Sequence, residues 1–228
     1  MLRFPVIDVA IDPSDAMRRI AIGGSAFAAL LTLLVLFVIG SFLQLPAVRH
    51  VELAMSNGPQ VPDVSAYHVW STAFSVGQFS QWLLGYLFVV AGLGLGAGIA
   101  TIAATLSGDG PRYARYFTAI ATIAVPCIGL YSITGGVVTA LVGPNAYASY
   151  DDLLRAIPSL LTVLPLFKNE FIRGALASIN PFALWAFALY RIMMTRIAGA
   201  SAGAANATAL VLLLAGSVAQ GVLSAVSV

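Results

Sequence analysis

Long stretches without a single Asp, Glu, Lys or Arg are the feature that most constrains this chain. A charged side chain at the middle of a bilayer costs roughly 2.5 to 3.5 kcal/mol, so uncharged gaps mark the segments that a membrane can hold. Counted inclusively, the gaps are Ile20 to Val48 (29 residues), Val64 to Gly108 (45), Tyr116 to Tyr150 (35), Gly174 to Tyr190 (17) and Ile197 to Val228 (32). A helix that crosses about 30 Å of hydrocarbon needs roughly 20 residues. The chain is therefore expected to be an all-α integral membrane protein.

The composition agrees with that expectation. Charged residues make up 9% of the 228 residues and hydrophobic residues 60%, whereas an ordinary soluble domain is about 25% charged. Eleven Lys and Arg against nine Asp and Glu leave a net charge of +2, which is too small for a nucleic-acid interface. The composition thus excludes a water-soluble fold and a nucleic-acid-binding protein, and it implies the lipid bilayer as the first partner.

Five membrane-spanning helices are expected, near residues 20–45, 82–106, 113–142, 171–194 and 205–226. The fourth gap is short, but Phe171 and Ile172 extend it, and Arg191 can snorkel toward the interface. The first span follows Arg18 and Arg19, as the core of a secretory signal would. Its apolar core exceeds the roughly 7 to 15 residues of such a signal, so a retained helix is expected.

Residues 153–167 allow a second topology with a sixth span. Both topologies leave seven basic residues inside and four outside, so charge does not choose between them. The 15 residues between Asp152 and Lys168 reach only about 22 Å at 1.5 Å per residue, and they include two prolines. We therefore expect an outer interfacial or re-entrant helix there. Because no internal repeat or break in composition is visible, residues 1–228 are expected to form a single membrane domain.

The distribution of Lys and Arg predicts the orientation, because these residues favour the cytoplasmic side. Seven basic residues are cytoplasmic if the N-terminus is inside and the C-terminus outside. This bias favours a bacterial inner membrane, with an organelle as the alternative. Six of these residues would form a ring that could contact anionic lipid headgroups, each contributing roughly 1 kcal/mol. They are Arg18, Arg19, Arg112, Arg115, Arg191 and Arg196.

Four alternate glycines in the second span predict close helix packing. Gly92 pairs with Gly96, and Gly94 with Gly98, at a spacing of four residues, which presents a flat face to a neighbouring helix. A phosphate-binding loop would need a preceding strand and a helix that opens onto water. Since these glycines lie inside a long uncharged segment, we interpret them as a helix-packing face.

Two spans carry residues that predict kinks. In the third span, Pro126 removes a backbone hydrogen bond, and Gly135 and Gly136 add conformational freedom. In the fourth span, Asn180 precedes Pro181 and can offer its amide to a carbonyl that the proline frees. Broken helices line binding cavities in some transporters. The favoured alternative is a helix bent to fit its neighbours, because no second, symmetric half repeats the break.

The chain offers little for catalysis or ion pumping. Both histidines lie in one connection, and no expected span holds Asp, Glu, Lys or His well inside it. No nucleophile therefore has a general base, and no intramembrane carboxylate is available to move protons. His50, Glu52, Asp63 and His68 are metal-ligand types, but they lack a short ligand spacing. Cys127 is expected to be an apolar filler, and no catalytic residue, metal or cofactor is expected.

Three short segments share features with one known family. Residues 12–20 place a proline before a basic pair that enters the first span, residues 108–117 join a glycine-containing turn to an aromatic-rich helix start, and residues 180–185 read Asn-Pro-Phe-Ala-Leu-Trp. In these segments the chain resembles the Yip family of Ypt/Rab-interacting multi-pass membrane proteins, especially its bacterial branch. The resemblance implies five membrane helices, a cytoplasmic N-terminus, an outer C-terminus, no enzyme activity and no cofactor. Partnership with small GTPases is not carried over, because the N-terminal region before the first span is short.

These features predict a non-enzymatic adaptor or accessory subunit of a larger membrane assembly. Its small-residue faces would hold it to other membrane subunits or to copies of itself. The alternative is a small transporter or channel-like protein that uses the kinked third span, and an enzyme comes third.

Overall fold

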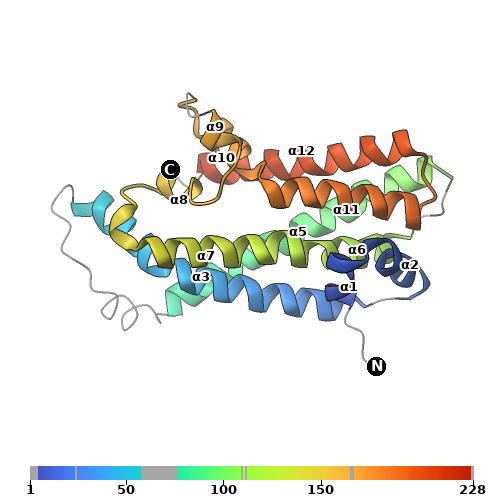
Figure 1. The fold of residues 1–228 in the computed structure, drawn as a ribbon, viewed down its shortest axis with the longest axis horizontal. Coiled ribbons are helices and arrows are strands. Elements are labelled where there is room, and N and C mark those ends of the chain that lie inside the picture. The colour runs from blue at the N-terminus through green and yellow to red at the C-terminus, as the bar shows by residue number, and fades with distance from the viewer. Residues whose placement is uncertain are drawn as a thin grey trace.

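The protein is a bundle of helices that run side by side (Figure 1). The computed structural model describes residues 5–23, 25–57, 76–108, 110, 112–164 and 167–226, and every regular element in these ranges is helical. Four helices are long and apolar enough to cross a membrane, and a bent pair makes a fifth span if its halves are counted together. The all-α membrane fold predicted from the sequence is confirmed.

Four of the candidate spans are continuous. Three of them are single helices: α3 (Ala26–Asn57), α5 (Val76–Leu106) and α12 (Ala202–Val226). The other is made of α6 (Tyr113–Ala124), the π-helical turn η1 (Val125–Gly129) and α7 (Leu130–Val142), which follow one another without a break. The bent pair consists of α10 (Glu170–Ser178) and α11 (Pro181–Ile197), at 62° to each other. The short elements are α1 (Pro5–Ile11), α2 (Pro13–Ile22), η2 (Pro144–Ala146), α8 (Tyr150–Leu154) and α9 (Leu160–Val163).

The connections divide the bundle into two ends (Figure 1). The N-terminal end holds α1, α2, the connection between α5 and α6, and the connection between α11 and α12. The C-terminal end holds α8, the end of α3 and the end of α12. The long helices alternate in direction between these two ends, as successive crossings of a membrane require.

The second, third and fifth expected spans agree with the structure, the last because α12 (Ala202–Val226) contains residues 205–226. Residues 82–106 and 113–142 coincide with the apolar stretches Trp82–Leu106 and Tyr113–Val142. The fourth span, expected over 171–194 with a kink at Asn180 and Pro181, is bent by 62° at these residues, which confirms the kink and divides the span into two helices. Asn180 and Pro181 end α10 and begin α11, because a proline fits the first turn of a helix better than its interior.

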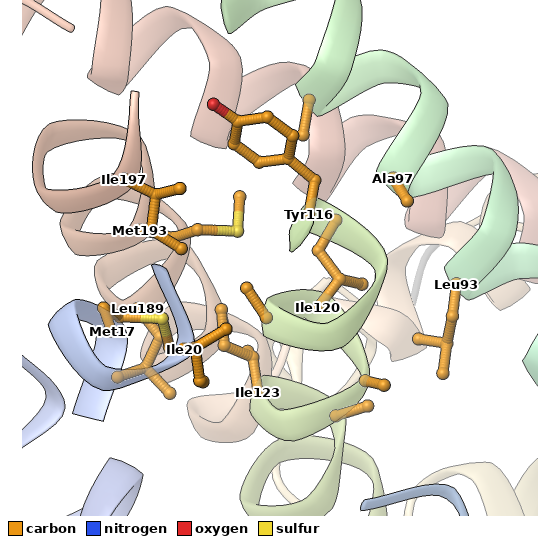
Figure 2. Close-up of a cluster of buried hydrophobic side chains, with 14 of the residues drawn as sticks. Met17, Ile20, Leu93, Ala97, Tyr116, Ile120, Ile123, Leu189, Met193 and Ile197 are labelled. Atoms are coloured by element: carbon orange, nitrogen blue, oxygen red, sulfur yellow. The ribbon is translucent and has the colours of Figure 1, made fainter. Parts of the chain in front are cut away.

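The first span begins later than the predicted residue 20. Ile20 belongs to the separate helix α2, and the spanning helix α3 begins only at Ala26. Met17 and Ile20 of α2 point into a buried cluster with Tyr116 of α6 and Met193 of α11 (Figure 2). The segment before the span is therefore an amphipathic helix docked on the N-terminal end of the bundle.

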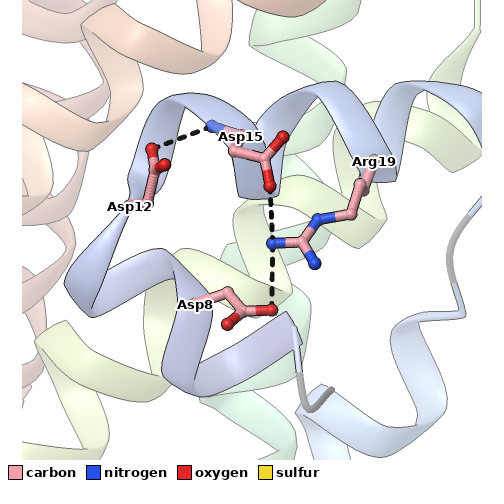
Figure 3. Close-up of polar contacts among 4 residues, drawn as sticks. All are labelled: Asp8, Asp12, Asp15 and Arg19. Atoms are coloured by element: carbon pink, nitrogen blue, oxygen red, sulfur yellow. Dashed lines mark hydrogen bonds and ion pairs between the residues drawn. The ribbon is translucent and has the colours of Figure 1, made fainter. Parts of the chain in front are cut away.

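An ion-pair network holds α1 against α2 (Figure 3). The guanidinium group of Arg19 lies 3.0 Å from a carboxylate oxygen of Asp8 and 3.0 Å from one of Asp15. Asp12, between the two helices, accepts a hydrogen bond of 3.1 Å from the backbone N–H of Asp15 and caps α2. Since such partly exposed pairs contribute only about 0 to 1 kcal/mol each, burial of the apolar face of α2 contributes more to its docking.

Met17→Ala is expected to weaken the docking of α2 by about 2 kcal/mol, because truncating a fully buried methionine removes its apolar contacts. The Met17 side chain is 0% exposed. Amide hydrogen exchange within residues 13–22 should then accelerate roughly 30-fold, since 1.4 kcal/mol is a factor of ten. Arg18→Ala, at an exposed position of the same helix, is the control and should leave exchange unchanged. Equal exchange in the wild type and both variants would contradict the docking of α2.

The other end of α3 extends beyond the predicted residue 45. The helix continues through Pro46 to Asn57, although proline removes a backbone hydrogen bond from a helix interior. Ala47 and Val51, which follow the proline, are buried against Tyr147 in a small second core. This packing supports the additional turns and places the end of α3 beside the segment that follows α7.

Residues 153–164 do not form a sixth span. They hold only the end of α8 and the short helix α9, neither of which is long enough to cross a bilayer. The backbone N–H of Leu160 donates a 3.0 Å hydrogen bond to the carbonyl of Ile179. Helix α9 is therefore tied to the junction between α10 and α11, which agrees with the expectation of an interfacial or re-entrant segment.

Candidate functional site

Two adjoining cavities lie between α7 on one side and α10, α11 and α12 on the other. The mid-bundle cavity has a volume of about 310 Å³, and the end cavity, nearer the C-terminal end, about 540 Å³. Tyr131, Leu154 and Gln220 line both cavities, so the two spaces meet at these residues. Their volumes match small-molecule sites, which are typically about 300 to 1,000 Å³.

The walls combine apolar side chains with hydroxyl and amide groups. The mid-bundle cavity is lined by Val89, Ala124, Cys127, Ile128, Tyr131, Leu154, Ala177, Ser178, Asn180, Phe182, Ala183, Ala186, Tyr190, Leu212, Leu213, Gly216, Ser217 and Gln220. The end cavity is lined by Gln44, Val48, Tyr131, Gly135, Thr139, Tyr150, Leu153, Leu154, Ala156, Ile157, Glu170, Gln220 and Ser224. Such a mixture of apolar walls and a few polar groups is typical of ligand pockets.

The π-helical turn η1 forms one wall of the mid-bundle cavity through Cys127 and Ile128. Pro126, which the sequence marks as a kink position, stands at the second residue of this turn. Proline has no N–H to donate to the preceding turn, and a single wider turn accommodates that loss. Single π turns inside α-helices occur frequently at functional sites.

The junction between α10 and α11 forms the opposite wall and is built around Asn180, which is only 7% exposed. Its side-chain oxygen accepts hydrogen bonds from the backbone N–H groups of Phe182 at 3.0 Å and Ala183 at 3.1 Å. Its side-chain nitrogen donates to the carbonyls of Ser178 at 3.2 Å and Ala177 at 3.5 Å. One side chain thus satisfies the ends of two helices where the bilayer offers no water.

Three polar side chains of the mid-bundle cavity are available to an occupant. Tyr131, Tyr190 and Gln220 have no hydrogen-bond partner among the residues that the structure describes. The ring of Tyr131 packs edge-on against Phe182, with ring centroids 6.0 Å apart, which holds the tyrosine in place. These three side chains are half-buried, and an occupant with donors or acceptors would supply hydrogen-bond partners for them.

Charge is sparse around the two cavities. Among the residues that the structure describes, no Asp, Glu, Lys, Arg or His lines the mid-bundle cavity, and Glu170 is the single charged residue in the wall of the end cavity, with Arg173 at 3.6 Å. Burial raises the pKa of the Tyr150 hydroxyl in the same wall, and Glu52 raises it further while Arg49 opposes the rise. Tyr150 therefore stays neutral at physiological pH.

The four glycines predicted to form a packing face divide into two kinds. Gly94 and Gly96 have side-chain atoms of α6 or α12 within 3.2 to 3.6 Å of the position that a Cβ would take. A Cβ at Gly92 or Gly98 would meet no atom of the described chain within 4 Å. Helix α5 therefore uses Gly94 and Gly96 inside the bundle and leaves Gly92 and Gly98 open.

The two glycines predicted to kink the third span lie in a regular helix. Gly135 and Gly136 are inside α7, which is α-helical from its first to its last residue. A Cβ at Gly136 would lie 2.8 Å from the carbonyl oxygen of Gly40, and a Cβ at Gly40 would lie 2.6 Å from the backbone of Ser132. Glycine at these positions lets the backbones of α3 and α7 approach closely. Gly40 was not predicted from the sequence as a packing position.

The six arginines predicted to contact headgroups lie at the N-terminal end of the bundle, on α2, α6 and α11 and beside the α5–α6 connection (Figure 1). Arg18, Arg112, Arg191 and Arg196 are exposed, and Arg115 is half-buried. Arg19 differs because Asp8 and Asp15 engage its charge. Its charge is therefore less available to a headgroup than that of the exposed members, and the headgroup contacts stay a prediction.

The candidate metal-ligand set is only partly within the described residues. His50 and Glu52 lie on α3, where Arg49 binds Glu52 at 2.8 Å, whereas Asp63 and His68 lie outside the described residues. No group of three potential metal-binding side chains occurs among the residues that the structure describes. Cys127, expected to be a filler, is buried and lines the mid-bundle cavity.

Comparisons with known proteins give no relative for this arrangement. The chain matches no protein-family model, and neither the curated proteins nor the solved structures that were searched include a significant match. The function is therefore argued from the geometry of the two cavities.

Proposed function

We propose that this protein is a small transporter-like membrane protein that binds a small molecule in the two cavities. The observation that carries the proposal is that the π-helical turn η1 and the break between α10 and α11 line the same mid-bundle cavity. Irregular backbone at membrane depth is tolerated where it is covered by protein or lines a cavity. In many transporters such interrupted helices form the substrate site.

Of the two interpretations of the kinked third span, the proposal favours a transporter whose binding cavity the span lines over a helix that is bent only to fit its neighbours. It is non-enzymatic and needs no cofactor. The excess of Arg at the N-terminal end of the bundle supports a cytoplasmic N-terminus and an outer C-terminus in a bacterial inner membrane. In that orientation the end cavity lies on the outer side. The resemblance to the Yip family stays a prediction.

Photolabelling of the full-length chain in proteoliposomes tests the proposal. The probe is a derivative of 1-decanol with a diazirine in its chain, which cross-links to whatever it contacts on irradiation. Lipid-facing residues will react in proportion to probe concentration. We expect Tyr131, Leu154 and other cavity residues to react saturably instead, with unlabelled 1-decanol as competitor.

A cavity-filling substitution makes the test specific. Ala183 lines the mid-bundle cavity, and Ala183→Phe should remove saturable labelling because the larger ring occupies the space. Ala188→Phe, at an exposed position of the same helix, is the matched control and should leave labelling intact. Absence of saturable labelling in the wild type, or equal labelling of the two variants, would overturn the proposed function.

A second candidate function is the accessory subunit or homo-oligomer, and the open glycines favour it. Gly92 and Gly98 lie six residues apart and so face directions about 120° apart on the helix, and each leaves room for a close helix from another chain. Gly92→Leu and Gly98→Leu should therefore reduce assembly in a mild detergent without destabilising the single chain. Gly96→Leu cannot serve this test because Gly96 packs inside the bundle. Unchanged assembly in both open-glycine variants would reject this candidate.

A further inference from the structure

We propose that the ligand of the two cavities is an uncharged amphiphile. Its hydrogen-bonding end is held by Tyr131 and Gln220 where the cavities meet, and its apolar tail lies in the mid-bundle cavity. The inference rests on the proposed binding function and names the ligand class for it.

The position of the polar end follows from the shared wall. Tyr131 and Gln220 line both cavities, and neither has a hydrogen-bond partner among the described residues. A tyrosine hydroxyl and a glutamine amide both donate and accept hydrogen bonds, so they suit an alcohol, ester or amide. Gln44 reaches the end cavity from α3, and its side-chain nitrogen donates to the Ser132 carbonyl at 3.4 Å.

The apolar part of the wall of the mid-bundle cavity indicates where the tail of the ligand lies. Val89 of α5, Ile128 of η1, Phe182 of α11 and Leu212 of α12 surround the mid-bundle cavity with apolar surface. Ser178 and Ser217, which also line it, are hydrogen-bonded to each other at 2.9 Å and so place no demand on a ligand. An alkyl chain gains from leaving water for such a space.

The walls of the two cavities also indicate that the ligand carries no charge. An ionised group is costly in an apolar site without an opposite charge, and no charged side chain in the described part of the chain lines the mid-bundle cavity. In the end cavity, an anion would be repelled by Glu170, and a cation would compete with Arg173, which lies 3.6 Å from that carboxylate. Both charge signs are therefore disfavoured relative to a neutral polar end.

Competition against the diazirine probe by a matched series tests the ligand class. The competitors are 1-decanol, decyl sulfate and decyltrimethylammonium, which share a chain and differ in charge. We expect 1-decanol to displace the probe at concentrations at least tenfold lower than either ion. Equal or better displacement by an ion would overturn the uncharged class while the binding function stands. Absence of saturable labelling with any competitor would instead reject the binding function itself.

Substitutions that remove only hydrogen bonds test the named residues. Tyr131→Phe and Gln220→Leu should each weaken displacement by 1-decanol about 3- to 10-fold, which corresponds to the loss of one neutral hydrogen bond. Displacement by decane, which has no polar end, should stay unchanged in both variants. Tyr113→Phe, at the N-terminal start of α6, is the matched control. Equal weakening of 1-decanol and decane would show a merely structural effect and overturn the assignment.

Discussion

Asn180→Leu is expected to lower the free energy of unfolding by about 2 to 4 kcal/mol, because it removes a helix cap and leaves buried backbone groups unsatisfied. Four backbone groups depend on this side chain, two at the end of α10 and two at the start of α11. Leucine branches at the same carbon and is larger than asparagine, so the loss does not come from a void. Unfolding of the purified chain by SDS in mixed micelles, followed by circular dichroism, measures the change.

Two further variants make this result interpretable. Asn180→Ser keeps a side-chain acceptor for the start of α11 but lacks the amide donor for the end of α10, so its loss should be intermediate. Asn206→Leu, at an exposed position of α12, should change the free energy of unfolding by less than about 0.5 kcal/mol. If Asn180→Leu and Asn206→Leu behave alike, Asn180 does not hold the junction together.

Gly40→Leu is expected to destabilise the bundle by about 3 kcal/mol or more, because overpacking a tight contact forces the backbone to move. A Cβ at this position would lie 2.6 Å from backbone atoms of Ser132, and backbone cannot rotate away as a side-chain tip can. Helices α3 and α7 would have to separate along their whole contact. The same SDS titration measures the loss.

Gly98→Leu is the matched control for the α3–α7 contact. A Cβ there meets no described atom within 4 Å, so the single chain should lose less than about 0.5 kcal/mol. Gly136→Leu should resemble Gly40→Leu, since a Cβ at Gly136 would lie 2.8 Å from the Gly40 carbonyl oxygen. Comparable stability of the Gly40 and Gly98 variants would contradict the close approach of α3 and α7.

The spans were predictable from the sequence because the cost of charge in hydrocarbon leaves long uncharged gaps. Trp82–Leu106 and Tyr113–Val142 were placed in this way and agree with the structure. The start of α3 was not predicted correctly, because Met17 and Ile20 continue the apolar pattern although they belong to the separate helix α2. Its extension past Pro46 was missed for a similar reason, since the supporting partner, Tyr147, is distant in the sequence.

The candidate site was only partly predictable. Pro126 and Asn180 were visible as irregular positions, but their meeting at one cavity depends on how α7, α11 and α12 pack. Tyr131 and Gln220 were missed, although each is a polar residue inside a long uncharged segment. Polar residues at membrane depth are costly and often functional, and this was the signal that could have found them.

Native mass spectrometry of the full chain, purified gently from its own membrane in a mild detergent, tests the central claim most directly. We expect one small molecule bound per wild-type chain, retained by the Ala188→Phe control and lost from Ala183→Phe. A wild-type chain that carries no small molecule but holds a stoichiometric membrane-protein partner would contradict the account. That result would make the accessory-subunit function the primary one.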